Sequence, residues 1–193
     1  MKNDLRIAGL VKDSIVDGPG LRFTVFTQGC PHHCKGCHNP KTHDFKGGRV
    51  VSIDYILKEL KSDRGATGVT FSGGEPFSQA TKLIPLAKKI REGGYDLASY
   101  SGWTFEELYS GKIPGARELL GYIDVLIDGK FILEQRSLEL SFRGSKNQRL
   151  IDVPKSLKMG FAVETNRIDW LGKEYKYNTM DEFAPKNIRD MGK

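Results

Sequence analysis

The chain has 193 residues, of which 38% are hydrophobic and 28% charged, and its formal net charge is +6. This length suits one domain with a single core, and the composition is that of a globular protein rather than a disordered chain. No apolar run approaches the roughly 20 residues that span a bilayer. Asp4 and Arg6 interrupt the N-terminus, which does not resemble a signal peptide, so we expect a cytoplasmic protein without a membrane partner.

Segments with strand character alternate with segments of helical spacing. Strands are predicted over 22–27, 68–71, 95–100 and 123–127, because these runs are apolar and mostly rich in β-branched or aromatic residues. Helices are predicted over 53–60, 83–90 and 105–109. The pattern weakens past Pro154, where 161–165 is compatible with one further strand. Alternating strands and helices predict an α/β fold with a mostly parallel sheet.

Each predicted strand runs into a distinctive loop. The first loop contains the cysteines, the second is Gly73-Gly74-Glu75-Pro76, the third is Ser101-Gly102-Trp103, and the fourth is Asp128-Gly129-Lys130. In parallel sheets, reactive groups gather on the loops at the carboxyl ends of the strands. The four loops therefore predict one site at a single edge of the sheet.

The chain contains three cysteines, Cys30, Cys34 and Cys37, and all of them lie in the first loop. An odd number within eight residues cannot form a disulfide framework, and in a reducing compartment such thiols are more often metal ligands or redox groups. Three thiolates could hold a 4Fe–4S cluster and leave one iron open. A zinc site completed by a histidine is the alternative, because Cys3His is a common structural ligand set.

The Gly-Gly-Glu-Pro loop has two interpretations. A plain connection between a strand and a helix explains it without any ligand. As a binding loop, its glycines would let the backbone approach a ligand closely, and Glu75 would accept hydrogen bonds from an ammonium group.

Together the two motifs resemble the radical S-adenosylmethionine (SAM) superfamily, and this resemblance favours the cluster over zinc. It implies that the open iron chelates the amino and carboxylate groups of the methionine moiety. One electron from the cluster then cleaves the S–C5′ bond and yields methionine and a 5′-deoxyadenosyl radical. Because that radical abstracts the hydrogen, we expect no protein residue to act as a general acid or base.

Further segments narrow the resemblance. Asp17-Gly18-Pro19-Gly20 and GCPHHCKGCHNP resemble the activating enzymes of glycyl radical enzymes. DVLIDGKF and SLELSFRGSKNQRLIDV are similar to the activating proteins of anaerobic ribonucleotide reductases. The resemblance covers roughly residues 5–153 and implies a partial (βα) barrel, open on one side. It predicts an activase domain over 1–153 and a C-terminal extension of unknown role over 154–193.

Site residues carry over from this family position by position. The resemblance implies cluster ligation by Cys30, Cys34 and Cys37. Ser99 stands where some pyruvate formate-lyase activators have an Asp that helps bind a cation, so that cation site is not carried over. Lys130 is expected near the carboxylate of SAM, although packing or surface roles are the alternative for several loop residues. The cofactor-binding set is Gly73, Gly74, Glu75, Pro76, Ser99, Ser101, Asp128, Lys130 and Arg143.

The resulting hypothesis is a reductive activase of an anaerobic (class III) ribonucleotide reductase. Its partners would be the large subunit of that reductase, docked near residues 143–149, and flavodoxin or ferredoxin as the electron donor. One alternative is activation of another glycyl radical enzyme, such as pyruvate formate-lyase, and a second is a small radical SAM enzyme of the deazaguanine pathway. A metal-stabilised nucleic-acid-binding module is disfavoured, because the glycine-rich and acidic loops form no aromatic and basic stripe.

Overall fold

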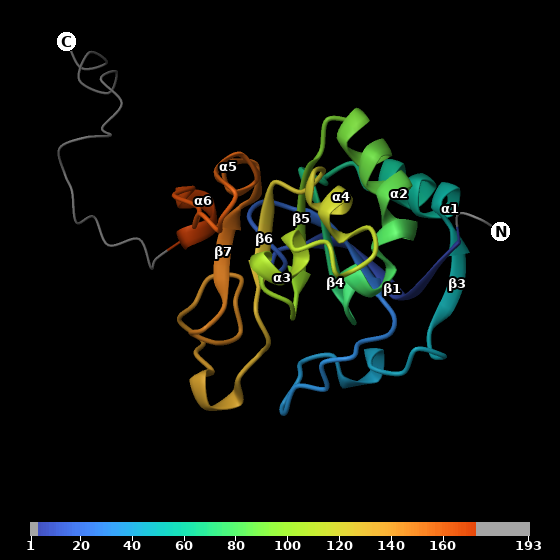
Figure 1. Ribbon diagram of the computed structural model, residues 1–193. Helices are drawn as coiled ribbons and strands as arrows, with labels where there is room; N and C mark the ends of the chain where they lie inside the picture. The colour runs from blue at the N-terminus through green and yellow to red at the C-terminus, as the bar shows by residue number, and fades with distance from the viewer. Residues whose placement is uncertain (1–3, 173–193) are drawn as a thin grey trace, which may run out of the picture.

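A computed structural model describes residues 4–172, which form one seven-stranded sheet with helices packed on it (Figure 1). The strand order is β3-β1-β2-β4-β5-β6-β7. The strands are β1 (Asp4–Ser14), β2 (Arg22–Thr27), β3 (Arg49–Ser52), β4 (Gly68–Gly73), β5 (Asp96–Ser101), β6 (Val125–Asp128) and β7 (Arg149–Asp152). The central strands β2, β4, β5 and β6 run parallel, and antiparallel strands flank them on both sides. The predicted α/β class with a mostly parallel central sheet is confirmed.

The central strands end level with one another. Thr27 of β2 lies beside Gly73 of β4, and Ser101 of β5 lies beside Asp128 of β6. The loops after all four strands therefore leave from the same edge, as the sequence predicts. Figure 1 shows the loop after β2 and the segment after β6 extending below the sheet at this edge.

The sheet is wider than the sequence predicts. The four expected parallel strands are present, but β1, β3 and β7 lie outside the predicted elements. Residues 161–165 make only an isolated bridge between Glu164 and Ile151, so a strand there is wrong. The physical reason is that the backbone N–H of Val163 donates to the Ser156 hydroxyl at 2.8 Å rather than to β7.

The predicted helices are confirmed, and local capping explains where they begin. Ser52 caps the first helix, because its hydroxyl accepts the Tyr55 backbone N–H at 3.1 Å. Thr104 and Glu107 form a capping box at the start of the third. The helices are α1 (Ile53–Ser62), α2 (Ala80–Glu92), α3 (Phe105–Tyr109), α4 (Ala116–Leu120), α5 (Val153–Met159) and α6 (Ile168–Leu171). Single 3-10 turns are η1 (Pro40–Thr42), η2 (Pro76–Gln79) and η3 (Leu133–Gln135).

Two apolar clusters lie on opposite faces of the sheet, because successive strand side chains alternate between faces. The larger cluster packs Leu97 and Leu126 against the helices. The smaller cluster contains Ala98 and Ile127 and is closed by Trp170 of α6, which is fully buried. Part of the predicted C-terminal extension thus packs on the sheet, while residues 173–193 lie outside the described residues. Between residues 4 and 172, every helix is too short or too polar to cross a membrane.

Candidate cofactor site

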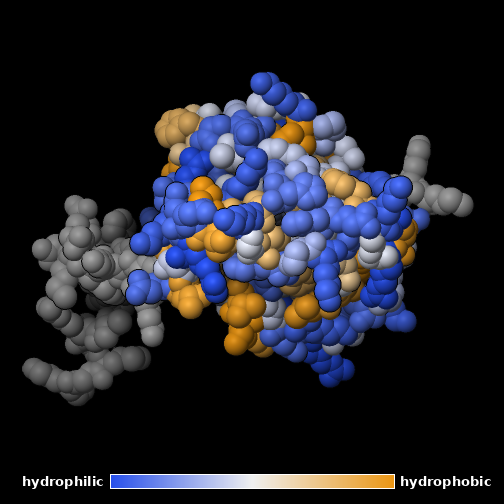
Figure 2. All heavy atoms as spheres, turned by 90° about the horizontal axis from the view of Figure 1, so that it is seen from below, coloured by the Kyte–Doolittle hydropathy of each residue, from blue (hydrophilic) through white to orange (hydrophobic). Residues whose placement is uncertain are grey.

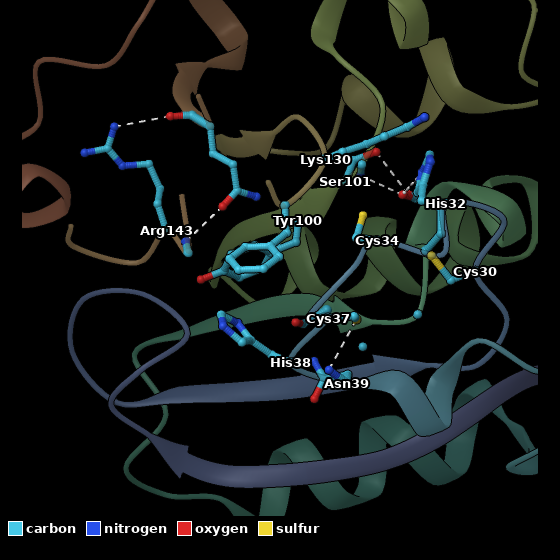
Figure 3. A pocket seen from close by; sticks show the side chains of 18 of the residues that line it. Cys30, His32, Cys34, Cys37, His38, Asn39, Tyr100, Ser101, Lys130 and Arg143 are labelled. Carbon is cyan, nitrogen blue, oxygen red and sulfur yellow. Dashed lines mark hydrogen bonds and ion pairs between the residues drawn. The ribbon is translucent and has the colours of Figure 1, made fainter. Parts of the chain in front are cut away.

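A cavity of about 630 Å³ opens at the carboxyl ends of the parallel strands. This volume is within the usual range for small-molecule sites. All four loops named above contribute to its wall. In the view of Figure 3 the three cysteines lie to the right of Tyr100, and Arg143 lies to its left. Of the predicted site residues, those that line it are Cys30, Cys34, Cys37, Gly73, Gly74, Glu75, Ser101, Lys130 and Arg143.

The cysteine loop is closed at its base by hydrogen bonds. Backbone N–H groups of Gly29 and Cys30 donate to the carbonyls of Thr42 and His43, at 2.8 and 3.1 Å. The buried Gln28 amide donates to the Asp44 carbonyl at 2.7 Å. All three cysteines are free thiols, and burial raises the pKa of Cys30. A cation or metal that stabilises the thiolate would offset this burial.

The Gly-Gly-Glu-Pro loop packs directly on the cysteine loop. The N–H of Gly74 donates to Thr27, and the N–H of Glu75 donates to Gly29, each at 2.8 Å. A Cβ on Gly74 would lie 2.5 Å from the Gly29 carbonyl oxygen, and one on Gly73 would lie 2.7 Å from the Thr27 backbone. The described contacts therefore require the two glycines for loop-to-loop packing, a reason that the sequence interpretation did not include.

Glu75 is 1% exposed, and both of its carboxylate oxygens already have protein donors. One oxygen accepts from the Phe77 backbone N–H and the Ser101 hydroxyl, each at 3.0 Å. The other accepts from the Gly102 N–H at 2.7 Å and from His32 Nε2 at 2.8 Å. A ligand ammonium could bind this carboxylate only if one of these donors were displaced. The geometry thus corrects the expectation that Glu75 is free to receive the ligand.

The segment around residues 143–148 is tied to the loop after β6. Gln148 Nε2 donates to the Gly129 carbonyl at 3.0 Å, and Asn147 Nδ2 donates to the Lys130 carbonyl at 2.8 Å. Gln148 Oε1 in turn accepts the Gly144 N–H at 2.8 Å. These side-chain amides hold the segment in place, so that Lys130 and Arg143 both line the cavity.

Three predicted cofactor-binding residues do not line the cavity. Ser99 and Asp128 share the helix-covered face with their strand neighbours two positions away. Asp128 accepts the Phe105 backbone N–H at 2.7 Å and pairs with Arg149 at 2.5 Å. Pro76 is buried at the first position of η2. For these three residues the expectation of cofactor contact is corrected to a structural role.

Tyr100 is a cavity residue that the sequence interpretation missed. It lies on the opposite face from Ser99, and its hydroxyl donates to the Phe142 carbonyl at 2.9 Å. Burial raises its pKa, so its hydroxyl stays protonated at neutral pH. Strict alternation along 96–101 was the signal that could have placed Tyr100, rather than Ser99, on the cavity side.

The model of a 4Fe–4S single cluster domain matches residues 16–151 of the chain. An anaerobic ribonucleoside-triphosphate reductase-activating protein from Haemophilus influenzae is 38% identical over 142 residues, which cover 69% of this chain and 89% of that protein. The protein of the same name from Vibrio cholerae matches with the same identity and coverage. The chain belongs to this family of activating proteins.

Membership of the activating-protein family decides between the two metal hypotheses. The matched 4Fe–4S domain includes all three cysteines, so the resident group is the predicted cluster and the zinc alternative is set aside. Within residues 4–172, no three His, Cys, Asp or Glu side chains form a group that could hold a single metal ion. The donor set fits the cluster, because three free thiols border one cavity and leave one iron for SAM. The family is one of radical SAM enzymes, and this chain is accordingly an iron–sulfur oxidoreductase.

Two further similarities differ in their reach. A pyruvate formate-lyase-activating enzyme from Clostridium pasteurianum is 40% identical over 112 residues, but these cover 53% of this chain and 47% of that protein. The crystal structure of QueE from Escherichia coli superposes with a TM-score of 0.44 at 18% identity, over 52% of this chain and 54% of that one.

Proposed function

We propose that the chain activates an anaerobic ribonucleoside-triphosphate reductase by generating a glycyl radical on it. The observation that carries this proposal is that the three cysteine thiols and the Gly73-Gly74 loop line one cavity in a chain that matches such activators over nearly their whole length. Bound there, the cluster and SAM supply a one-electron cleavage to methionine and a 5′-deoxyadenosyl radical, which takes a hydrogen atom from a glycine of the partner.

The residues of the chain hold and orient these groups. We propose that Cys30, Cys34 and Cys37 ligate three irons of the cluster. The backbone of Gly73 and Gly74 forms the wall beside the methionine moiety. Lys130 and Arg143, the two cations of the predicted site set, line the same cavity and suit the carboxylate of SAM. Tyr100 contributes an aromatic wall that excludes water.

Coverage favours the reductase over pyruvate formate-lyase as the partner. The chain spans 89% of the reductase activator but only 47% of the lyase activator, although the local identity is similar in the two matches. The lyase remains the second candidate on the strength of that local identity. The cavity mouth includes Ile15 and Val16, each 71% exposed, and these suit contact with a polypeptide segment.

The remaining proposals concern the donor and the architecture. Lys35, Lys41 and Lys46 of the cysteine loop are exposed, which supports docking of an acidic one-electron donor such as flavodoxin or ferredoxin. We also propose that the sheet acts as a partial (βα) barrel open toward the partner. The division into a 1–153 activase domain and a 154–193 extension is likewise a proposal.

Electron paramagnetic resonance after anaerobic mixing tests this function. The reconstituted chain, dithionite and SAM are combined with either the reductase or pyruvate formate-lyase. We expect a glycyl radical doublet on the reductase and none on the lyase. A doublet on the lyase alone would assign the chain to the second candidate, and SAM cleavage with neither doublet would contradict glycyl radical activation.

A further inference from the structure

His32 lies between two cluster cysteines in the sequence, yet its side chain points away from solvent and toward the next loop. The side chain is only 5% exposed, and Nε2 lies 2.8 Å from Oε2 of Glu75 (Figure 3). Glu75 belongs to the Gly-Gly-Glu-Pro loop after β4. A side chain of the cysteine loop therefore bonds directly to the proposed SAM-binding loop.

The carboxylate of Glu75 extends this link to a third loop. Its Oε2 also accepts the Gly102 N–H at 2.7 Å, and its Oε1 accepts the Ser101 hydroxyl at 3.0 Å. Both donors belong to the end of β5 and the loop that follows. His32 and Glu75 thus join the loops after β2, β4 and β5 in one buried network, which is fully satisfied at the carboxylate.

Packing leaves the imidazole ring little freedom. Its centroid lies 4.6 Å from that of Trp103, edge to face at 74°. A Cβ on Gly102 would lie 2.3 Å from the ring, so the ring occupies the space that this glycine leaves open. A hydrogen bond in a packed, buried setting holds a fixed geometry rather than an average one.

We propose that His32 is a positioning residue that sets the Gly-Gly-Glu-Pro loop against the cysteine loop. Through Glu75 it holds the two loops in the register that lets SAM meet the open iron, without itself touching the cluster or SAM. A displacement of about 1 Å at a reacting centre can cost on the order of 100-fold in rate. The inference rests on the proposed placement of SAM beside Gly73 and Gly74.

Three substitutions at this position separate a specific hydrogen bond from general packing. His32→Ala removes the donor, His32→Asn shortens it, and His32→Gln places an amide nitrogen near the position of Nε2. We expect wild-type iron and sulfide content in all three after anaerobic reconstitution. Calorimetry should show SAM affinity at least tenfold weaker in the Ala and Asn variants, about 1.4 kcal/mol, and largely restored in the Gln variant.

A spectroscopic readout tests the same point without turnover. SAM should change the electron paramagnetic resonance spectrum of the reduced cluster in the wild-type protein and the Gln variant. At the same SAM concentration it should leave the spectrum of the Ala variant unchanged. His33→Asn is the matched control, because His33 is the exposed neighbour with φ 48°, a conformation that asparagine tolerates, and its ring packs on His43 instead.

Specific outcomes would overturn the inference. Wild-type SAM affinity in His32→Ala, or failure of His32→Gln to restore affinity, would show that the hydrogen bond does not position the loop. Loss of iron in His32→Ala but not in His33→Asn would make His32 part of cluster retention instead. If the wild-type protein with a full cluster does not bind SAM, the proposed function itself fails.

Discussion

At the scale of single residues, Gly74 shows how a binding loop can be constrained from behind. Its missing Cβ leaves room for the Gly29 carbonyl, which lies one residue before Cys30 in the cysteine loop. Any side chain at position 74 must therefore push the two loops apart. Because the obstructing atoms belong to the backbone, the strain cannot be relieved by a rotamer change.

Gly74→Ala should accordingly affect both cofactors. We expect iron content after reconstitution to fall, SAM affinity to weaken by at least tenfold, and the free energy of unfolding to drop by about 1–3 kcal/mol. Iron assay, calorimetry and urea unfolding measure these three quantities. Gly9→Ala is the control, since a Cβ there has open space. Normal iron content with lost SAM affinity would mean that Gly74 contacts only the ligand.

At the scale of elements, an ion pair ties strands together at the edge opposite the cavity. Arg22 begins β2 and reaches across Gly68 of β4 to Asp96 at the start of β5, with Nη1 and Oδ1 2.5 Å apart. Only glycine at position 68 leaves room for this path, because a Cβ there would collide with the guanidinium. Arg167 bonds the other oxygen of Asp96 at 2.9 Å and so fastens the start of α6 to the sheet.

This pair gives the protein a defined acid sensitivity. Burial acts to raise the pKa of Asp96, but Arg22 and Arg167 outweigh it and hold the pKa below its usual value. A lowered pKa contributes stability that is present above the ordinary value of about 3.9 and is lost as the pH falls through the folded value.

Asp96→Asn should therefore be destabilising near neutrality, by about 3 kcal/mol, since Arg22 is 2% exposed and would lose its charged partner. The difference from wild type should narrow below about pH 4. Urea unfolding at pH 7 and at pH 3 measures both values. Asp169→Asn is the control at an exposed pair with Arg167 and should cost less than about 1 kcal/mol. A difference that does not change with pH would rule out the charge as its origin.

At the scale of the whole molecule, the cavity opens to a surface with both polar and apolar side chains. Figure 2, which looks onto the molecule from below the view of Figure 1, shows hydrophobic patches among hydrophilic ones. Ile15 and Val16, in the connection between β1 and β2, are exposed and also line the cavity. An exposed apolar rim around a reactive site is typical of a surface that a partner covers.

Replacing both rim residues with serine should weaken partner docking. We expect the KM for the reductase, measured by the initial rate of glycyl radical formation, to rise about tenfold, which corresponds to about 1.4 kcal/mol. Met159→Ser with Phe161→Ser is the matched control, because these side chains are about equally exposed but do not line the cavity. An unchanged KM, or a defect traced by calorimetry to SAM affinity alone, would contradict a docking role.

The sequence by itself determined the chemistry and the central elements. Cys30, Cys34 and Cys37 specify cluster ligands by type and spacing, and the helical period of α1 and α2 depends only on near neighbours. The parallel strands were also readable, because each is a short apolar run followed by a distinctive loop.

Only the tertiary structure decided the partners of Glu75, Asp128 and Arg22, since these contacts join residues 21 to 74 positions apart. It also placed β1, β3 and β7, whose polar edge residues hide the strand pattern, and it turned Ser99 and Tyr100 to opposite faces. The physical reason is that local patterns record the backbone preferences of each segment. Strand register and loop packing depend instead on which distant groups meet.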